Sequence, residues 1–171
     1  MRALVVYESM FGNTRSIADA VALGLREAGV EVEVVEVGTA PTGPAEDVGL
    51  LVVGAPTHAL SLSRPESRRS ASEQADGAIV SMGIGLREWL AALPTGHALV
   101  AAFDTHIDRK VPGAASRAAL KRLRRRGYHA AEPAQSFYVS DTVGPLVEGE
   151  VERARRWGLE LAASSLVGQQ G

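Results

Sequence analysis

The loop at residues 8–14 carries the clearest chemical signal in the sequence. It follows a short apolar run, Ala3–Tyr7, and opens a segment with helical periodicity. Backbone N–H groups at a helix start have no intrahelical partner and lie at the positive end of the helix dipole, so they bind anions. Ser9, Asn13 and Thr14 add side-chain donors, and Gly12 permits close backbone approach. The loop therefore predicts a phosphate site; an ordinary helix cap is the alternative interpretation.

Two common phosphate-binding motifs do not describe this loop. A dinucleotide-binding loop needs G-x-G-x-x-G, and a Walker loop needs a lysine after its last glycine. This loop has a single glycine and no lysine. The later Gly83-Ile84-Gly85 precedes a helical pattern but follows no buried strand, so we interpret it as a connection.

The segments around the loop alternate between strand and helix patterns, with no internal repeat and no linker. Apolar runs without polar alternation predict strands that are buried on both faces. The predicted strands are Ala3–Tyr7, Val30–Val37, Leu50–Val53, Leu99–Phe103 and a split fifth strand, Tyr128–Ala131 with Ser136–Val139. Helices are predicted from Thr14 to Gly29, within the Ser- and Arg-rich stretch Thr57–Gly85, at Leu86–Leu93, from Ala114 to near Gly127 and from about Leu146 to Leu166.

This order predicts one domain over residues 1–171, an α/β three-layer sandwich. Val30–Val37 alternates in polarity and is expected at a sheet edge, which favours a five-stranded parallel sheet in the order 2-1-3-4-5. Ligands of such sheets bind at the carboxyl ends of the strands, where the strand order reverses. The loops to inspect are therefore Glu8–Thr14, Ala55–Ser63 and Asp104–Pro112.

Composition excludes several classes of function. The chain has 171 residues and no cysteine, which rules out disulfides, thiolate catalysis and cysteine-ligated metal centres. Its 18 basic and 20 acidic residues give a net charge of -2, so no overall field favours nucleic acid. The first apolar run is too short for a signal peptide or a membrane span, and four scattered histidines form no metal-ligand pattern. We expect a cytoplasmic protein.

Several of these segments together resemble the flavodoxin family. The run Ser9-Met10-Phe11-Gly12-Asn13-Thr14 after a strand is similar to the flavodoxin signature [ST]-x-[ST]-G-x-T, with Phe11 where the family prefers Ser or Thr. Gly54-Ala55-Pro56-Thr57-His58 resembles the second flavin loop, and the likeness continues through Phe103-Asp104-Thr105 to Gly144-Pro145-Leu146. No insertion splits the fifth strand, so the chain looks like a short-chain flavodoxin-like protein of the actinobacterial type.

The resemblance implies a flavodoxin-like sandwich that binds one FMN and shuttles single electrons between a reductase and an acceptor enzyme. It implies redox partner proteins, a monomer, no catalytic side chain, no metal, and neither nucleic acid nor membrane as partner. The residues implied at the phosphate are Ser9, Met10, Phe11, Gly12, Asn13 and Thr14. Those implied at one flavin face are Pro56, Thr57, His58 and Ala59, and at the other side and the pyrimidine edge Phe103, Asp104, Thr105 and His106.

Two alternatives stay open at this point. One is an NAD(P)H-dependent quinone or flavin reductase of the same fold. The other is a module that keeps the fold without the flavin. Phe11 and the lack of Tyr or Trp in Asp104–Val111 favour this alternative. His58 and Asp104 can also be interpreted without a functional role, His58 as a surface histidine and Asp104 as an aspartate that faces water.

Other prominent residues have ordinary structural interpretations. Trp89 and Trp157 lie on helical apolar stripes and are predicted in the core. The basic run Lys121–Arg126 is interpreted as a solvated helix end that complements the dipole. Arg64, Arg68 and Arg69 follow the second loop; a solvated helix face is one interpretation, and a basic rim that docks an acidic partner or a nicotinamide nucleotide is the other.

Overall fold

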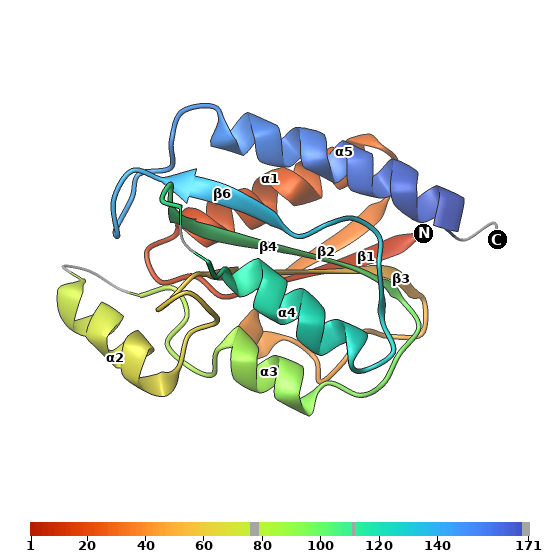
Figure 1. The fold of residues 1–171 in the computed structure, drawn as a ribbon. Helices are drawn as coiled ribbons and strands as arrows, with labels where there is room; N and C mark the ends of the chain where they lie inside the picture. The colour runs from red at the N-terminus through yellow and green to blue at the C-terminus, as the bar shows by residue number, and fades with distance from the viewer. Residues whose placement is uncertain (76–78, 111, 169–171) are drawn as a thin grey trace.

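A computed structural model describes residues 1–75, 79–110 and 112–168 of the chain as one twisted sheet between two layers of helices (Figure 1). The strands are β1 (Arg2–Tyr7), β2 (Glu31–Glu36), β3 (Val48–Pro56), β4 (Leu99–Ile107), β5 (His129–Ala130) and β6 (Gln135–Val139). The helices are α1 (Asn13–Glu27), the 3-10 turn η1 (Val37–Thr39), α2 (Pro65–Gln74), α3 (Leu86–Ala92), α4 (Ala115–Arg124) and α5 (Glu150–Gly168).

The sheet is parallel and has the predicted strand order. The order is β2-β1-β3-β4-β5, and β6 also pairs with β4. β5 pairs with the first residues of β4 and β6 with the last, so together they form the split fifth strand that the sequence indicates. Edge strand β2 pairs only with β1, in agreement with its alternating polarity.

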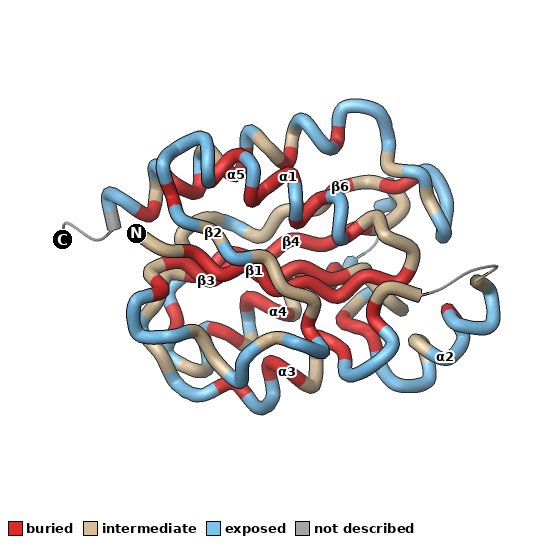
Figure 2. The backbone as a smooth tube through the Cα atoms, turned by 180° about the vertical axis from the view of Figure 1, so that it is seen from behind, coloured by how far each residue is buried: buried red, intermediate tan, exposed pale blue. Residues whose placement is uncertain are grey.

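Each face of the sheet has its own hydrophobic core. Helices α1 and α5 cover one face, and α3 and α4 cover the other (Figure 1). Trp157 lies in the first core and Trp89 in the second, both almost fully buried as predicted. The central strands are buried almost throughout, whereas α2 is largely exposed and projects beyond the carboxyl ends of the strands (Figure 2).

Two predicted boundaries are wrong by four residues, and the third strand also extends beyond the predicted Leu50–Val53. The fourth strand does not end at Phe103 but continues to Ile107, because β6 pairs with it from Phe103 onward. The last helix begins at Glu150 rather than near Leu146, because Leu146 forms an antiparallel bridge with Val139 and the N–H of Val147 donates to the carbonyl of Tyr138. None of the helices in the described part of the chain combines the length and the apolar character that a membrane crossing requires.

Candidate functional site

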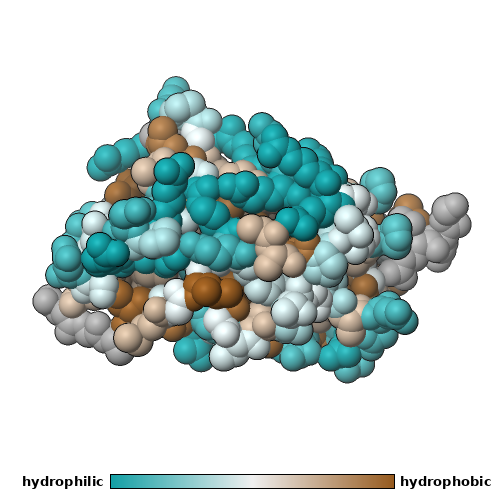
Figure 3. Space-filling model, turned by 90° about the horizontal axis from the view of Figure 1, so that it is seen from below, coloured by the Kyte–Doolittle hydropathy of each residue, from teal (hydrophilic) through white to brown (hydrophobic). Residues whose placement is uncertain are grey.

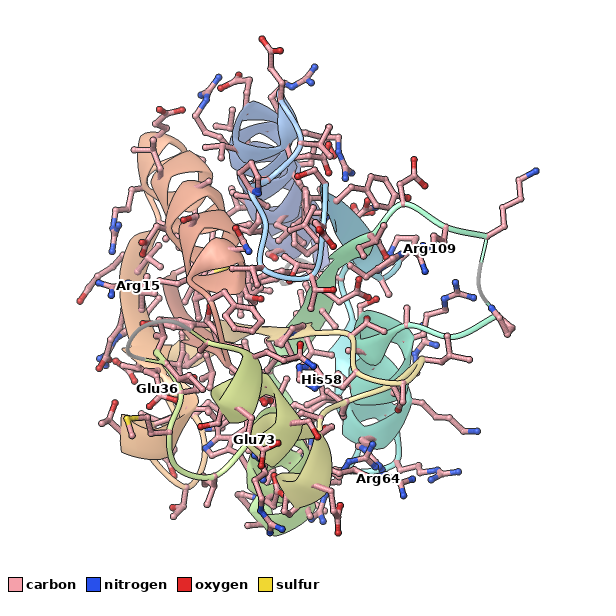
Figure 4. The ribbon with its side chains drawn as sticks, turned by 90° about the vertical axis from the view of Figure 1, so that its left-hand side faces the viewer. Arg15, Glu36, His58, Arg64, Glu73 and Arg109 are labelled. Atoms are coloured by element: carbon pink, nitrogen blue, oxygen red, sulfur yellow. The ribbon has the colours of Figure 1, made fainter. Side chains whose placement is uncertain are left out.

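A cavity of about 450 Å³ lies at the carboxyl ends of β1, β3 and β4, where the strand order reverses. Figure 4 looks onto this end, with His58 near its centre and Arg109 on the loop after β4. The cavity volume falls in the range of small-molecule and cofactor sites. The predicted residues that line it are Ser9, Met10, Phe11, Asn13, Thr14, Pro56, Thr57, His58, Ala59, Thr105 and His106. The three loops singled out in the sequence therefore meet at one cavity.

Phe103 and Asp104 do not line this cavity. Phe103 is only 1% exposed and packs in the core against Phe137 and Trp157, with ring centroids 6.1 and 6.2 Å away. Its position as a flavin contact in the sequence analysis is therefore corrected: because strand side chains alternate, Phe103 points to the α1–α5 face. Asp104 is fully buried and does not face water.

The loop before α1 is arranged as an anion site. Gly12, which is not among the lining side chains, adopts a left-handed conformation with φ of 91° as the N-cap residue. The Oγ of Ser9 accepts hydrogen bonds from the N–H groups of Gly12 at 3.1 Å and Arg15 at 3.3 Å, which shapes the turn from within. Within the described residues, the N–H groups of Asn13 and Thr14 have no protein acceptor. These two donors, at the positive end of the α1 dipole, remain for a bound anion.

Threonine hydroxyls tie the cavity walls together. Thr14 Oγ1 lies 2.7 Å from Thr105 Oγ1, so the first turn of α1 is bonded to β4. Thr57 Oγ1 accepts from the N–H of Ala115 at 2.9 Å, which bonds the second loop to the start of α4. The hydroxyl of Thr14 thus has a protein partner, and its role is to hold the wall as well as to face the cavity.

Asp104 and His106 form a pair at the cavity wall. His106 Nδ1 lies 2.6 Å from Asp104 Oδ1, and the other carboxylate oxygen accepts from the N–H of Ser116 at 3.0 Å. The hydrogen bond to Asp104 raises the pKa of His106 above 6.5, although partial burial acts against it. With Nδ1 engaged, Nε2 is the ring nitrogen left for a bound molecule. The wall can therefore present a positively charged N–H donor.

The pKa of His58 is shifted in the opposite direction to that of His106. Burial lowers the pKa of its imidazole below 6.5, and the nearby charge of Arg68 lowers it further. A neutral ring is therefore expected near pH 7. The cavity thus has one neutral and one readily protonated histidine, a distinction that the sequence did not reveal.

The turn that carries His58 is strained. His58 and Ser61 exchange both backbone hydrogen bonds, and the two residues between them, Ala59 and Leu60, have positive φ values of 45° and 68°. Turns of this kind prefer Asn-Gly, because a side chain in this conformation costs about 1–2 kcal/mol. Strained backbone of this sort is found preferentially at ligand sites.

Sequence reasoning missed several residues at the site. Arg109 is the one arginine or lysine among the described residues that line the cavity, and it lies in a loop already selected for inspection. Helix α2 supplies Ser67, Ser70, Ala71 and Gln74, for which the sequence offers no signal, because only the fold brings α2 against the cavity.

Glu8, directly after β1, forms buried hydrogen bonds to the segment that precedes α2 and to the first residue of α3. It is fully buried, accepts from the N–H of Leu86 at 2.9 Å and is bonded to the hydroxyl of Ser63. Burial raises the pKa of its carboxyl, against the stabilising hydrogen bonds. Glu8 therefore connects the end of β1 to the starts of α2 and α3, which hold the second loop in place.

The proposed basic rim is only partly available for docking. Arg68 is bonded to Ser63 at 2.8 Å and forms an ion pair with Glu88 at 2.7 Å, with 12% of its side chain exposed. Arg68 therefore holds the protein's own loops together, and the sequence interpretation that placed it in a docking rim is wrong. Arg64 and Arg69 are exposed.

We predict that the Asp104→Asn substitution lowers the pKa of His106, because it removes the carboxylate that favours the protonated ring. The raised pKa of His106 stabilises the native protein fully below pH 6.5, and this contribution is lost as the pH rises through the raised value. The free energy of unfolding of the variant should therefore lose this pH dependence. NMR titration of the imidazole protons and urea denaturation at several pH values measure both effects.

A matched control is Asp108→Asn, which removes an exposed carboxylate that acts on His106 only through space. This variant should lower the pKa of His106 by much less. If the two variants gave the same His106 titration as the native protein, the Asp104–His106 pair would have no electrostatic role.

Comparisons with known proteins support the fold. No family model matches the sequence, and no curated protein is similar to it. Among solved structures, a flavodoxin from the domain Archaea has a TM-score of 0.68 at 20% identity and covers 97% of this chain and 99% of its own. Oxidised flavodoxin 1 from Bacillus cereus has a TM-score of 0.68 at 20% identity, covering 95% of this chain and 98% of its own.

Rubredoxin:oxygen oxidoreductase from Desulfovibrio gigas contains the same arrangement within a larger chain. It has a TM-score of 0.66 at 17% identity and covers 99% of this chain but 37% of its own. At these identities the likeness establishes the flavodoxin-like fold, and the chemistry has to be argued from the site.

Proposed function

We propose that this chain, which has the flavodoxin-like fold, binds FMN in the cavity and transfers electrons between a reductase and an acceptor enzyme. The observation that carries the proposal is the helix N-terminus that opens into a cavity of about 450 Å³ at the switch point of the sheet, with two N–H groups that have no partner among the described residues. Several structural neighbours named flavodoxins share this fold, which adds support.

The residues fit the cofactor. The N–H groups of Asn13 and Thr14 and the α1 dipole suit a phosphate dianion. The cavity walls beyond them are mostly uncharged, with Phe11 and His58 as the rings able to pack on a flat heterocycle. The donors Arg109 and His106 suit the electron-rich edge of such a ring.

FMN, when bound, supplies one-electron transfer chemistry; the protein supplies binding, orientation and electrostatics. The N–H groups of Asn13 and Thr14 hold the phosphate, and the turn at Ala59 and Leu60 presents backbone groups to the cavity. His106 on β4, held by Asp104, places a cationic N–H at the cavity wall, which favours added negative charge nearby. No side chain is required as a nucleophile.

The visible spectrum of the freshly purified protein tests this proposal. We expect a yellow protein, and quenching of FMN fluorescence with a stoichiometry of one when FMN is added to the stripped protein. A colourless protein that leaves FMN fluorescence unchanged would instead identify a module that has the fold without the flavin.

The Asp104–His106 pair supports a second candidate, an NAD(P)H-dependent quinone or flavin reductase. A histidine with a raised pKa can hold a proton at the cavity wall, and the two-electron reduction of a quinone to a hydroquinone takes up two protons. Anaerobic mixing of the FMN-loaded protein with NADPH alone decides between the two. Fast bleaching without any added reductase would favour the second candidate.

A further inference from the structure

A second hollow lies between α3 and α4 and shares no residue with the first cavity. It measures about 440 Å³ and is lined by Arg87, Leu90, Ala91, Thr95, Arg122, Arg125 and Arg126. None of these described lining residues is acidic. Figure 3 shows this side of the molecule, with strongly hydrophilic side chains gathered over α3 and α4. We call this hollow the arginine groove.

Two of its arginines are held in place by backbone carbonyls. Arg87 donates from Nη2 to the carbonyl of Leu62 at 2.7 Å and from Nε to that of Ser63 at 3.0 Å. Arg126 donates to the carbonyls of Ala91 and Leu93, at the end of α3. Their guanidinium groups are therefore positioned before any ligand binds, which reduces the entropy lost on binding.

The groove contains unbalanced positive charge. The Nε of Arg122 is buried and has no hydrogen-bond partner among the described residues. No ion pair in the described ranges involves any of the four arginines, since nearby Glu88 is paired with Arg68. Burial lowers the pKa of Arg87, and the charges of Arg122, Arg64 and Arg68 lower it further. Clustered like charges and a buried unpaired donor are unfavourable in the protein alone.

This finding corrects the sequence interpretation of Lys121–Arg126 as a solvated helix end only in part. Lys121, Arg124 and Arg125 are exposed as expected, whereas Arg122 and Arg126 are half-buried. Arg122, Arg125 and Arg126 turn toward α3 and line the groove, because α3 packs beside α4. Arg124, on the same helix, is exposed and does not line it.

We propose that the arginine groove binds a small polyanion that carries two or more phosphoryl groups, such as the phosphate chain of a nucleotide or an inorganic polyphosphate. The planar guanidinium group binds phosphate oxygens through paired hydrogen bonds, which several converging arginines can share. A hollow of this volume suits a compact ligand rather than a flat protein surface. Leu90 and Ala91 add an apolar wall on one side.

Isothermal titration calorimetry of the full chain with inorganic tripolyphosphate tests the proposal, with saturating FMN in buffer of about 0.15 M ionic strength, where the Debye length is about 8 Å. We expect one site, and a dissociation constant at least about tenfold higher in the double variant Arg122→Gln/Arg125→Gln, since each lost arginine removes charge-assisted hydrogen bonds. The matched control Arg124→Gln/Arg156→Gln removes two exposed charges outside the groove. It should change the constant by less than about twofold, because neither side chain lines the groove and charges outside it are screened at this ionic strength.

Repeating the titration with ATP distinguishes a nucleotide from an inorganic polyphosphate as the natural ligand. Tighter binding of ATP than of tripolyphosphate identifies a nucleotide, and equal binding identifies the phosphate chain alone; either result supports the site. Absence of binding at roughly 1 mM tripolyphosphate overturns the proposal, as does equal weakening by the control variant. Citrate that binds as tightly as tripolyphosphate would also overturn the phosphoryl assignment. FMN fluorescence is recorded separately, so failure at the groove leaves the cofactor proposal untouched.

Discussion

The substitution Asn13→Asp should weaken FMN binding by about 100-fold without unfolding the protein. Asn13 is the first residue of α1 and lines the cavity at the proposed phosphate site. A carboxylate about 5 Å from a phosphate repels it by about 3 kcal/mol at an effective dielectric of 20, which corresponds to about two powers of ten in affinity. Acidic residues in the first turn stabilise a helix, so the fold should tolerate the change. Quenching of FMN fluorescence measures the affinity.

Two control variants separate charge from other effects. Asn13→Ala removes the amide that donates to the carbonyl of Val143 at 2.9 Å, without adding charge. Ser16→Asp adds the same charge to the same turn at an exposed position that does not line the cavity. Both should change FMN affinity by less than about fivefold, since an exposed charge is screened. If Asn13→Asp bound FMN as tightly as the native chain, the phosphate would lie elsewhere.

The substitution Gly54→Ala should destabilise the fold by about 3 kcal/mol, with a thermal midpoint lower by about 10 °C. Gly54 on β3 lies beside Phe103 on β4, and a Cβ at Gly54 would overlap the Phe103 ring. The ring has little room to move aside, because Phe137 and Trp157 both pack against it. Urea and thermal denaturation measure the loss.

A double-mutant cycle shows whether this overlap is the cause. Phe103→Leu alone should cost about 1–2 kcal/mol through lost packing. Combined with Gly54→Ala, the total loss should be at least about 1 kcal/mol smaller than the sum of the two, since the shorter side chain makes room for the new methyl group. Additive losses would show that another contact is responsible.

The same variant tests the corrected position of Phe103. Because Phe103 lies in the core and not at the cavity, Phe103→Leu should leave FMN affinity unchanged. A large loss of affinity in a folded Phe103→Leu protein would restore the flavin contact that the sequence analysis expected.

The sequence by itself determined the strand order, the split fifth strand and the three loops that form the cavity. These features follow from local patterns: apolar runs predict buried strands, the alternating run Val30–Val37 predicts an edge, and one glycine before a helix predicts an anion site. In a parallel sheet the connections must be right-handed crossovers, so few arrangements remain once the elements are known.

Only the tertiary structure decided which side chains face the cavity and which charges have partners. The extension of β4 to Ile107 depends on pairing with β6, and it sends Phe103 to one core while it places Asp104 against His106. Likewise, the partner of Arg68 is Glu88, twenty residues away, and the groove arginines converge from two helices. Such contacts join residues distant in sequence, and a local pattern contains no information about them; packing between elements alone brings them together.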